Sequence, residues 1–223
     1  MKYFFSLLFL SLTGILTANA QPAVKLFNDT DLKGWYAFEP GAGKHADASE
    51  VFKVQEGMIR LYGDKTGYLM SEASFSDFDL TAEFRWNTDP SVQKRSNSMN
   101  SGVMYLVPAS TPDVLWPQGI QFQIKQGATG DFVLLKNVTV SQNGARTQAG
   151  ESVVVARSQD AEKPAGEWNT LTVTVQKGKI VQTLNGTKVN EATEPSVDEG
   201  RILLQYEGFP IDFRKLEIRP IRK

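Results

Sequence analysis

Cysteine is missing from this chain of 223 residues, and histidine occurs only once. Without cysteine there is no disulfide, no thiolate nucleophile and no thiolate metal ligand. A single histidine cannot supply a multi-histidine metal site within one chain. The 24 basic and 25 acidic residues nearly cancel, so no global field of one sign directs the protein toward nucleic acid or anionic lipid. These absences exclude much of the common chemistry of enzymes.

Long apolar runs are missing after the first twenty residues. Lys2 gives a positive start, residues 3–16 are mostly apolar, and Ala18-Asn19-Ala20 fits the small-x-small rule for signal cleavage. We therefore expect residues 1–20 to be a cleaved secretory signal peptide, since the run is short for a bilayer span. An uncleaved anchor is the alternative. The mature domain, 21–223, is then expected in the periplasm or outside the cell, with no membrane span.

Short segments in which apolar and polar residues alternate follow one another along the rest of the chain. This period of two predicts strands with one buried and one outward face. The clearest segments are 79–86 (DLTAEFRW), 119–125 (GIQFQIK), 171–175 (LTVTV), 180–184 (IVQTL), 187–191 (TKVNE), 201–207 (RILLQYE) and 211–218 (IDFRKLEI). Asn185-Gly186 predicts a two-residue hairpin turn, because both of its central residues need a positive φ.

Helical patterns with caps are also missing. The best candidate, residues 160–167, contains Pro164 and Gly166 and is expected to be a loop. Many short strands without helices between them predict an all-β fold, either a two-sheet antiparallel sandwich or a barrel. No repeat, low-complexity tract or linker divides the chain, so we expect one domain.

The outward residues of several strands are glutamine, asparagine, tyrosine, glutamate and arginine. Amides, carboxylates and guanidinium groups can form paired hydrogen bonds to neighbouring hydroxyls, and an aromatic ring can cover the apolar face of a sugar. The composition therefore favours a sheet surface that binds a carbohydrate. An ordinary solvated face is the alternative.

Several groups of residues follow one another in a distinctive order and spacing: 26–35 (LFNDTDLKGW), 75–80 (FSDFDL), 83–86 (EFRW), 100–103 (NSGV), 166–169 (GEWN), 184–186 (LNG), 204–208 (LQYEG) and 212–214 (DFR). In this arrangement the chain resembles the 3-keto-disaccharide hydrolase family over roughly residues 24–221. The resemblance implies a concanavalin-like jelly-roll sandwich that is exported and hydrolyses glycosides whose sugar is oxidised at C3.

The same resemblance identifies 116–124 as the central strand of a concave, sugar-binding sheet. Relatives usually carry glutamate where this chain has Gln121, two residues before a glutamine that Gln123 matches. Glutamine can bind a hydroxyl but cannot transfer the catalytic proton. Many relatives carry histidine near the end of the penultimate strand, where this chain has Glu207, as one branch of the family does.

Glycoside cleavage ordinarily needs an acid at the leaving oxygen and a second group that activates water or attacks the sugar. A ketone at C3 offers another route, because it acidifies the C2 hydrogen and lets one base drive elimination before water adds. Glu207, beside Gln205 and before a glycine turn, is the expected acid or base, with a surface carboxylate as the alternative. Asp131 is the expected second carboxylate, unless it only serves its turn.

The remaining candidates are binding residues. Arg85 could hold a ketone oxygen, or could form a structural ion pair together with Glu83. Tyr105 could stack on sugar or fill the core, and Trp116, in a loop, is the expected stacking platform. With Gln121, Gln123 and Gln205 they make up the expected substrate-binding set. Trp35, Trp86 and Trp168 are expected in the core.

Two functions remain open. One is an exported enzyme that cleaves 3-keto-glycosides, and the other is a catalytically silent carbohydrate-binding protein that uses the same sheet. No cofactor is predicted. A divalent metal is possible, although no complete oxygen-ligand pattern occurs in the sequence.

Overall fold

Alternating side chains give each long strand one buried row and one outward row. In β7 (Phe78–Trp86) fully buried residues alternate with half-buried ones along all nine positions, and β14 (Asn169–Gln176) follows the same pattern up to its last residue. Such strands bury one row against a facing sheet and leave the other row outside. The computed structural model describes residues 22–221, and the predicted signal peptide lies outside this range.

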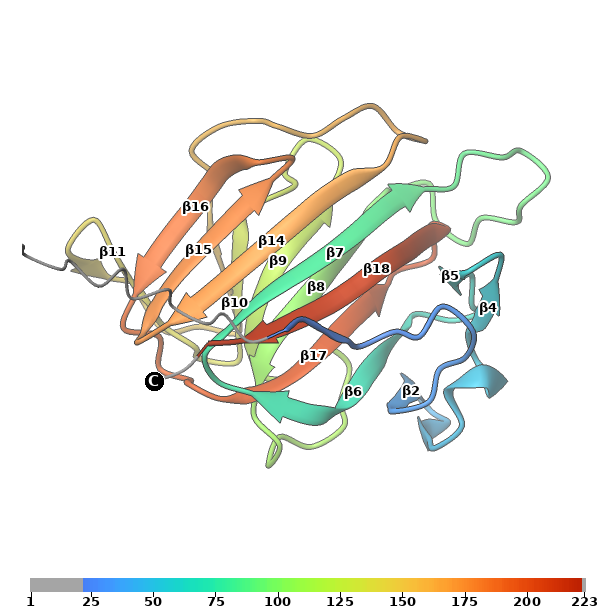
Figure 1. Ribbon diagram of the computed structural model, residues 1–223, viewed down its shortest axis with the longest axis horizontal. Helices are drawn as coiled ribbons and strands as arrows, with labels where there is room; N and C mark the ends of the chain where they lie inside the picture. The colour runs from blue at the N-terminus through green and yellow to red at the C-terminus, as the bar shows by residue number, and fades with distance from the viewer. Residues whose placement is uncertain (1–21, 222–223) are drawn as a thin grey trace, which may run out of the picture.

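Two antiparallel sheets pack face to face (Figure 1). In order across the first sheet, its eight strands are β13 (Ser152–Val155), β10 (Phe132–Leu135), β9 (Gly119–Lys125), β8 (Asn100–Val107), β17 (Gly200–Tyr206), β6 (Gly67–Phe75), β2 (Trp35–Glu39) and β3 (Gly43–His45).

The second sheet has ten strands. In order they are β12 (Ala145–Arg146), β11 (Ser141–Gln142), β16 (Thr187–Thr193), β15 (Lys179–Leu184), β14, β7, β18 (Ile211–Pro220), β5 (Met58–Leu61) and β4 (Lys53–Gln55), with β1 (Val24–Lys25) also paired to β18. The helical content of the described residues is one 3-10 turn, η1 (Ala48–Glu50). The predicted all-β, two-sheet antiparallel fold is confirmed.

The last two long strands complete the middle of both sheets. β17 lies between β8 and β6, and β18 lies between β7 and β5. The insertion of β17 therefore brings the residues around 205–207 next to β8, which is about a hundred positions earlier in the sequence. This connection assembles the outward surface of the eight-stranded sheet.

The predicted hairpin turn is confirmed. Asn185 and Gly186 have φ values of 52° and 80°, and Lys177 and Gly178 repeat the arrangement at 49° and 72°. Both residues of each pair lie in the left-handed region that two-residue turns between twisted strands require. Residues 160–167 form a loop, as expected.

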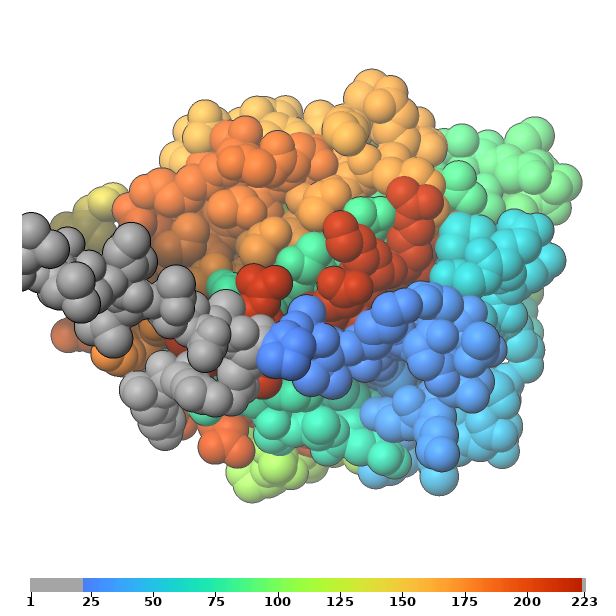
Figure 2. Space-filling model, in the orientation of Figure 1, coloured from blue at the N-terminus to red at the C-terminus, as the bar shows by residue number. Residues whose placement is uncertain are grey.

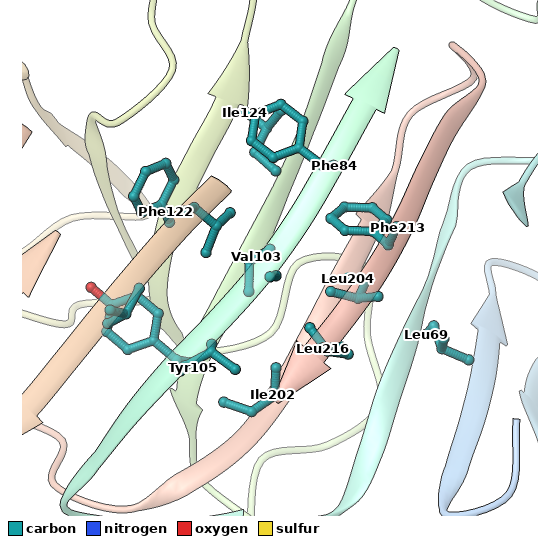
Figure 3. Packing of buried hydrophobic residues seen from close by; sticks show 14 of the residues in the cluster. Leu69, Phe84, Val103, Tyr105, Phe122, Ile124, Ile202, Leu204, Phe213 and Leu216 are labelled. Carbon is teal, nitrogen blue, oxygen red and sulfur yellow. The ribbon is translucent and has the colours of Figure 1, made fainter. Parts of the chain in front are cut away.

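Large apolar side chains from both sheets fill the space between them (Figure 3). Val103, Phe122 and Leu204 come from the eight-stranded sheet, and Phe84 and Phe213 from the ten-stranded one; all five are fully buried. Trp35 and Trp86 belong to this core, as expected. Trp168 does not, because it lies on the outer face of the ten-stranded sheet, where the guanidinium of Arg214 stacks 3.9 Å from its ring centre.

Candidate functional site

A chain of hydrogen-bonded side chains crosses the outer face of the eight-stranded sheet and ends on a carboxylate. Gln121 donates through Nε2 to Gln123 Oε1, and Gln123 donates through Nε2 to Asn100 Oδ1 at 3.1 Å. Asn100 then donates through Nδ2 to Glu207 Oε2. We call Gln121, Gln123 and Asn100 the amide chain. It brings together three residues that the sequence analysis selected, namely Gln121, Gln123 and Glu207.

Strand register explains why these side chains meet. Gln123 on β9 pairs with Gly102 on β8, and Gly102 pairs with Gln205 on β17. Directly paired residues project to the same face of a sheet. Asn100 begins β8 and Glu207 follows the last residue of β17, so both lie at the same end of this row.

Gly102 makes room for the amide chain. A Cβ atom at this position would lie 2.5 Å from Cδ and 2.6 Å from Nε2 of Gln121. Any larger residue would therefore collide with the Gln121 side chain, which lies across β8 at this point. The absence of a side chain at 102 is what lets residue 121 reach toward Gln123.

Glu207 is half-buried, and its carboxyl is the titratable end of the amide chain. Burial raises the pKa of Glu207 above the usual value for glutamate, while the hydrogen bond from Asn100 and the positive charge of Lys125 oppose the shift. Desolvation that outweighs charge stabilisation makes a carboxylate a stronger base, and such perturbed groups are common at functional sites. This carboxyl is thus suited to act as a general base or acid.

Gln205 supplies an unused acceptor in the same row. Its side chain is 3% exposed, and its Oε1 has no hydrogen-bond partner among the described residues. A buried carbonyl oxygen without a partner is costly unless a ligand or water completes it. Gln205 therefore leaves one acceptor of this row without a donor from the described residues.

Beyond the amides, the outer face becomes apolar and is covered by residues 108–118, which we call the strap. Leu115 and Trp116 of the strap pack on a cluster that includes Met70, Met104 and Leu203. Trp116 is half-buried and has a φ of 56°. The expected stacking residue thus lies over the sheet that carries the amide chain.

Asp113 fastens the strap to the sheet. Its Oδ1 accepts hydrogen bonds from the hydroxyl of Tyr36 at 2.6 Å and from that of Tyr68 at 3.1 Å. Arg201 donates to the Tyr36 hydroxyl at 2.8 Å and to the carbonyl of Pro108 at 3.2 Å. Burial and the neighbouring Asp113 raise the pKa of both tyrosines, which keeps them protonated donors.

Tyr105 is not part of this surface. Its ring lies between the two sheets, fully buried (Figure 3), and its hydroxyl donates to Gln182 Oε1 at 3.0 Å. The expectation that it stacks on sugar is wrong, because its side chain projects from the opposite face of β8 to Gly102 and Met104.

Arg85 and Glu83 lie on the other sheet. Both project from the outer face of β7, which Figure 2 shows as the green surface beside the red of β18. Arg85 Nε bonds Asp212 Oδ2 at 3.0 Å, and Glu83 Oε2 accepts from Arg214 Nε at 2.7 Å. Placing them on the ligand surface with Gln121 is wrong, since the sandwich core separates the two outer faces.

Arg85 also lines a separate hollow. Together with Arg60, Asn87 and Asp89 it borders a cavity of about 660 Å³ beside the end of β7. Its guanidinium lies 4.8 Å from the ring centre of Trp168. The Arg85 side chain is therefore held by an ion pair on one side and an aromatic ring on the other.

Asp131 serves the turn between β9 and β10. Its Oδ1 accepts a hydrogen bond from the backbone N–H of Arg157 at 2.8 Å. That contact ties the hairpin to the segment after β13 and matches the structural alternative for this residue. The structure does not join Asp131 to Glu207 through any side-chain hydrogen bond of the described residues.

Asn100, Gly102 and Asp113 were not selected from the sequence as site residues. Asn100 and Gly102 stand in the NSGV segment that contributes to the family resemblance, and this was the available signal for them. Asp113 lies in a loop without periodicity, so the sequence gave no signal for it. Over residues 22–221, no three histidine, aspartate or glutamate side chains gather as a metal-binding group. In the same range no helix is long and apolar enough to cross a membrane.

Solved structures share this architecture at low sequence identity. A candidate glycosyl hydrolase from Parabacteroides distasonis superposes with a TM-score of 0.64 at 18% identity, covering 90% of this chain and 94% of that one. The β-glucanase of Bacillus licheniformis gives 0.54 at 13% identity, covering 92% and 100%. The carbohydrate-binding module CBM66 of Bacillus subtilis gives 0.51 at 13%, covering 83% and 95%. At these identities the likeness establishes the fold.

No curated protein matches the chain. The description of one protein family, by contrast, matches almost all of the residues that the structure describes. It covers residues 22–219, from before β1 to the last residue but one of β18, and so includes the amide chain, Glu207 and the strap. The chain therefore belongs to the family of 3-keto-alpha-glucoside-1,2-lyase-like domains.

Proposed function

We propose that this protein is an exported enzyme that cleaves 3-keto-glycosides on the outer face of its eight-stranded sheet, with Glu207 as the proton-transfer residue. The observation that carries the proposal is the half-buried Glu207 carboxyl at the end of the amide chain. Burial raises the pKa of Glu207 above its usual value, which makes its carboxylate a stronger base. Family membership supports the sugar substrate.

One carboxylate suits elimination better than direct displacement. Displacement at a glycosidic carbon ordinarily uses two carboxyl groups about 5–10 Å apart. Glu207 is bonded to an amide, and Asp131 is engaged with a backbone N–H. A substrate ketone removes the need for the second carboxyl, because it makes the neighbouring C–H acidic.

The proposed reaction consists of an elimination followed by a hydration. Glu207 takes the proton from C2, and the electron pair of the C2–H bond passes toward the C3 carbonyl as an enolate. The enolate then expels the oxygen at C1, giving a C1=C2 double bond conjugated with the ketone, and the leaving alcohol takes up the proton. Addition of water across the double bond gives the free 3-keto sugar. Amide donors near the carbonyl oxygen would stabilise the enolate.

The neighbouring residues suit the sugar itself. Gln205 Oε1 has no partner among the described residues, and the half-buried Gln123 presents its amide on β9. Trp116 of the strap offers an aromatic ring beside them on the same face. Sugar sites commonly combine planar amide groups with one aromatic face.

The second candidate is a catalytically silent carbohydrate-binding protein. Gln121 favours it, because an amide stands where relatives usually carry glutamate and the site is left with one titratable group. Secretion belongs to both candidates and depends on the signal peptide predicted for residues 1–20.

The decisive experiment uses the protein from Gln21 onward. It is incubated with 3-keto-disaccharides and their unoxidised parents, with and without a divalent metal, and released monosaccharide is measured. Release from keto substrates alone, lost in Glu207→Gln, is the expected result. No release, combined with saturable binding of the same sugars by calorimetry, would replace the enzyme with the binding protein.

A further inference from the structure

The amide chain has a direction that the charge of Glu207 dictates. An ionised carboxylate can only accept, so Asn100 must present Nδ2 to it and Oδ1 to the next residue. Gln123 must then donate to Asn100 and accept at its own Oε1. Each amide oxygen of the chain therefore accepts from the amide nitrogen of the residue before it. Gln121 Nε2 is the first donor of the series.

Position 121 is poorly suited to exchanging a proton with a ligand. The Gln121 side chain is 3% exposed, lies across Gly102 and uses its Nε2 within the chain. A glutamate in this place would have to be protonated to make the same hydrogen bond. Glutamine has the shape of a protonated glutamate and donates permanently.

We propose that Gln121 is a positioning residue that acts as a fixed hydrogen-bond donor and, through Gln123 and Asn100, holds Glu207 in its accepting, carboxylate form. Under this inference, which rests on the role proposed for Glu207, the amide at 121 is compatible with catalysis. Position 121 then orders the chain, and Glu207 alone moves the proton.

A carboxyl at both ends of the chain would behave differently. Two ionised carboxylates, at positions 121 and 207, would both need to accept, but the amides between them donate in one direction only. The two carboxyl groups would therefore share one proton. Groups coupled in this way titrate in two separated steps that belong to the pair. In the native chain Glu207 should instead titrate in one step.

Few other charges act on Glu207. Lys125 of β9 is the cation that favours its ionised form. Arg95, whose backbone N–H contacts the carbonyl of Gly208, is paired with Asp64. The variants of the test leave Lys125, Arg95 and Asp64 unchanged. A change in the titration of Glu207 therefore reports on the amide chain.

The test is a carbon-13 NMR titration of the Glu207 side-chain carboxyl, assigned with Glu207→Gln, which needs no substrate. Gln121→Met keeps the length of the side chain and removes the donor, so the midpoint of Glu207 should rise by about half a pH unit. Gln121→Glu should restore a donor while protonated, and should give two steps separated by at least about one unit.

Two controls separate the chain from simple charge repulsion. Gln123→Met breaks the chain without touching Glu207, and in this background the separation caused by Gln121→Glu should shrink. Gln205→Glu places a carboxyl two residues from Glu207 on the same face but outside the chain, and it measures the through-space effect.

An unchanged Glu207 midpoint in Gln121→Met would overturn the proposal, as would a separation in Gln121→Glu that survives Gln123→Met undiminished. The titration and the turnover assay fail independently. Coupling without turnover would leave this proposal standing and remove the enzyme, and turnover without coupling would do the reverse.

Discussion

Two carboxylates lie on opposite outer faces of this sandwich, and their surroundings differ. Asp212 on the ten-stranded sheet is fully buried, with the Tyr62 hydroxyl and Arg85 Nε bonded to it and Arg60 Nε 4.0 Å away. Glu207 is bonded by a neutral amide and remains partly open. Two arginines lie within 4.0 Å of the Asp212 carboxylate, whereas no cation of the described residues is directly bonded to Glu207. The comparison separates a carboxylate that stabilises the fold from one that can do chemistry.

The largest effect is expected from Glu207→Gln. The variant keeps the shape and the hydrogen bond to Asn100 but cannot accept a proton, and general acid–base catalysis ordinarily contributes about 10²–10⁴ in rate. We expect turnover of 3-keto-glycosides to fall by that factor while sugar binding stays within about twofold. Equal loss of binding and turnover would indicate that Glu207, like Asp212, has a structural role. The measurement is steady-state kinetics with calorimetric binding.

Arg85→Met tests the other carboxylate. Removing Arg85 leaves the buried Asp212 carboxylate with the more distant Arg60 as its cation, so we expect the free energy of unfolding to fall by about 3 kcal/mol. Turnover per folded molecule should be unchanged, because the amide chain lies on the other sheet. The double variant with Asp212→Asn should recover part of the loss, since it removes the stranded charge. Urea unfolding followed by tryptophan fluorescence measures these changes, and a kinetic defect without a stability loss would contradict this assignment.

Gly102→Ala is expected to disturb the packing of the amide chain that leads to Glu207. The added methyl would lie within 3 Å of Gln121, and overpacking of this kind costs about 1–3 kcal/mol. The amide chain should be displaced with it, and turnover should fall as well. Adding Gln121→Ala relieves the collision and should restore stability but not turnover. Stability and turnover recovering together would mean that the chain does not act on Glu207.

Tyr105→Phe is expected to have a small effect. The hydroxyl lies in the core, so the loss is one buried hydrogen bond to Gln182, about 1 kcal/mol in the free energy of unfolding. Turnover and sugar affinity should not change. A weakened sugar affinity, measured by the same calorimetry, would return Tyr105 to the ligand surface.

Glu207 should also give a weak dependence of stability on pH. Its pKa is raised in the folded protein, so between the unfolded and folded values the folded state binds more protons, and stability falls as pH rises. Glu207→Gln lacks this titration. The unfolding free energy of the variant minus that of the native protein should therefore increase from about pH 4 to pH 7. Chemical denaturation at several pH values checks the sign, and a decreasing difference would contradict it.

Local periodicity was enough to predict the strands and the faces of β7 and β9. In both strands the apolar set 80, 84, 86 or 120, 122, 124 is buried, and the polar set projects outward as expected. Alternation reports which residues share a face of one strand. It does not report to which sheet that strand belongs, and for this reason Arg85 was grouped with Gln121 although they lie on opposite faces of the sandwich.

Long-range pairing explains the remaining differences. Asn100 contacts Glu207 across 107 positions of sequence, a contact that follows from the insertion of β17 beside β8. Tyr105 lies in β8, which is buried on both faces. The sequence pattern of this strand therefore did not show to which face the Tyr105 side chain projects. Trp168 precedes β14 and opposes Arg85, which draws it to the outer face.

The strap, with Asp113 bonded to Tyr36 and Tyr68, has a thermodynamic consequence for any ligand of the eight-stranded sheet. Its backbone is already ordered before a ligand arrives, so binding loses little conformational entropy in this segment. The change in heat capacity on binding should then reflect the apolar area of the ligand alone, without the large contribution that accompanies the folding of a loop. Ligands would be ranked by their fit to a fixed wall beside Trp116, and the same wall would limit how far a longer glycan could extend across the sheet.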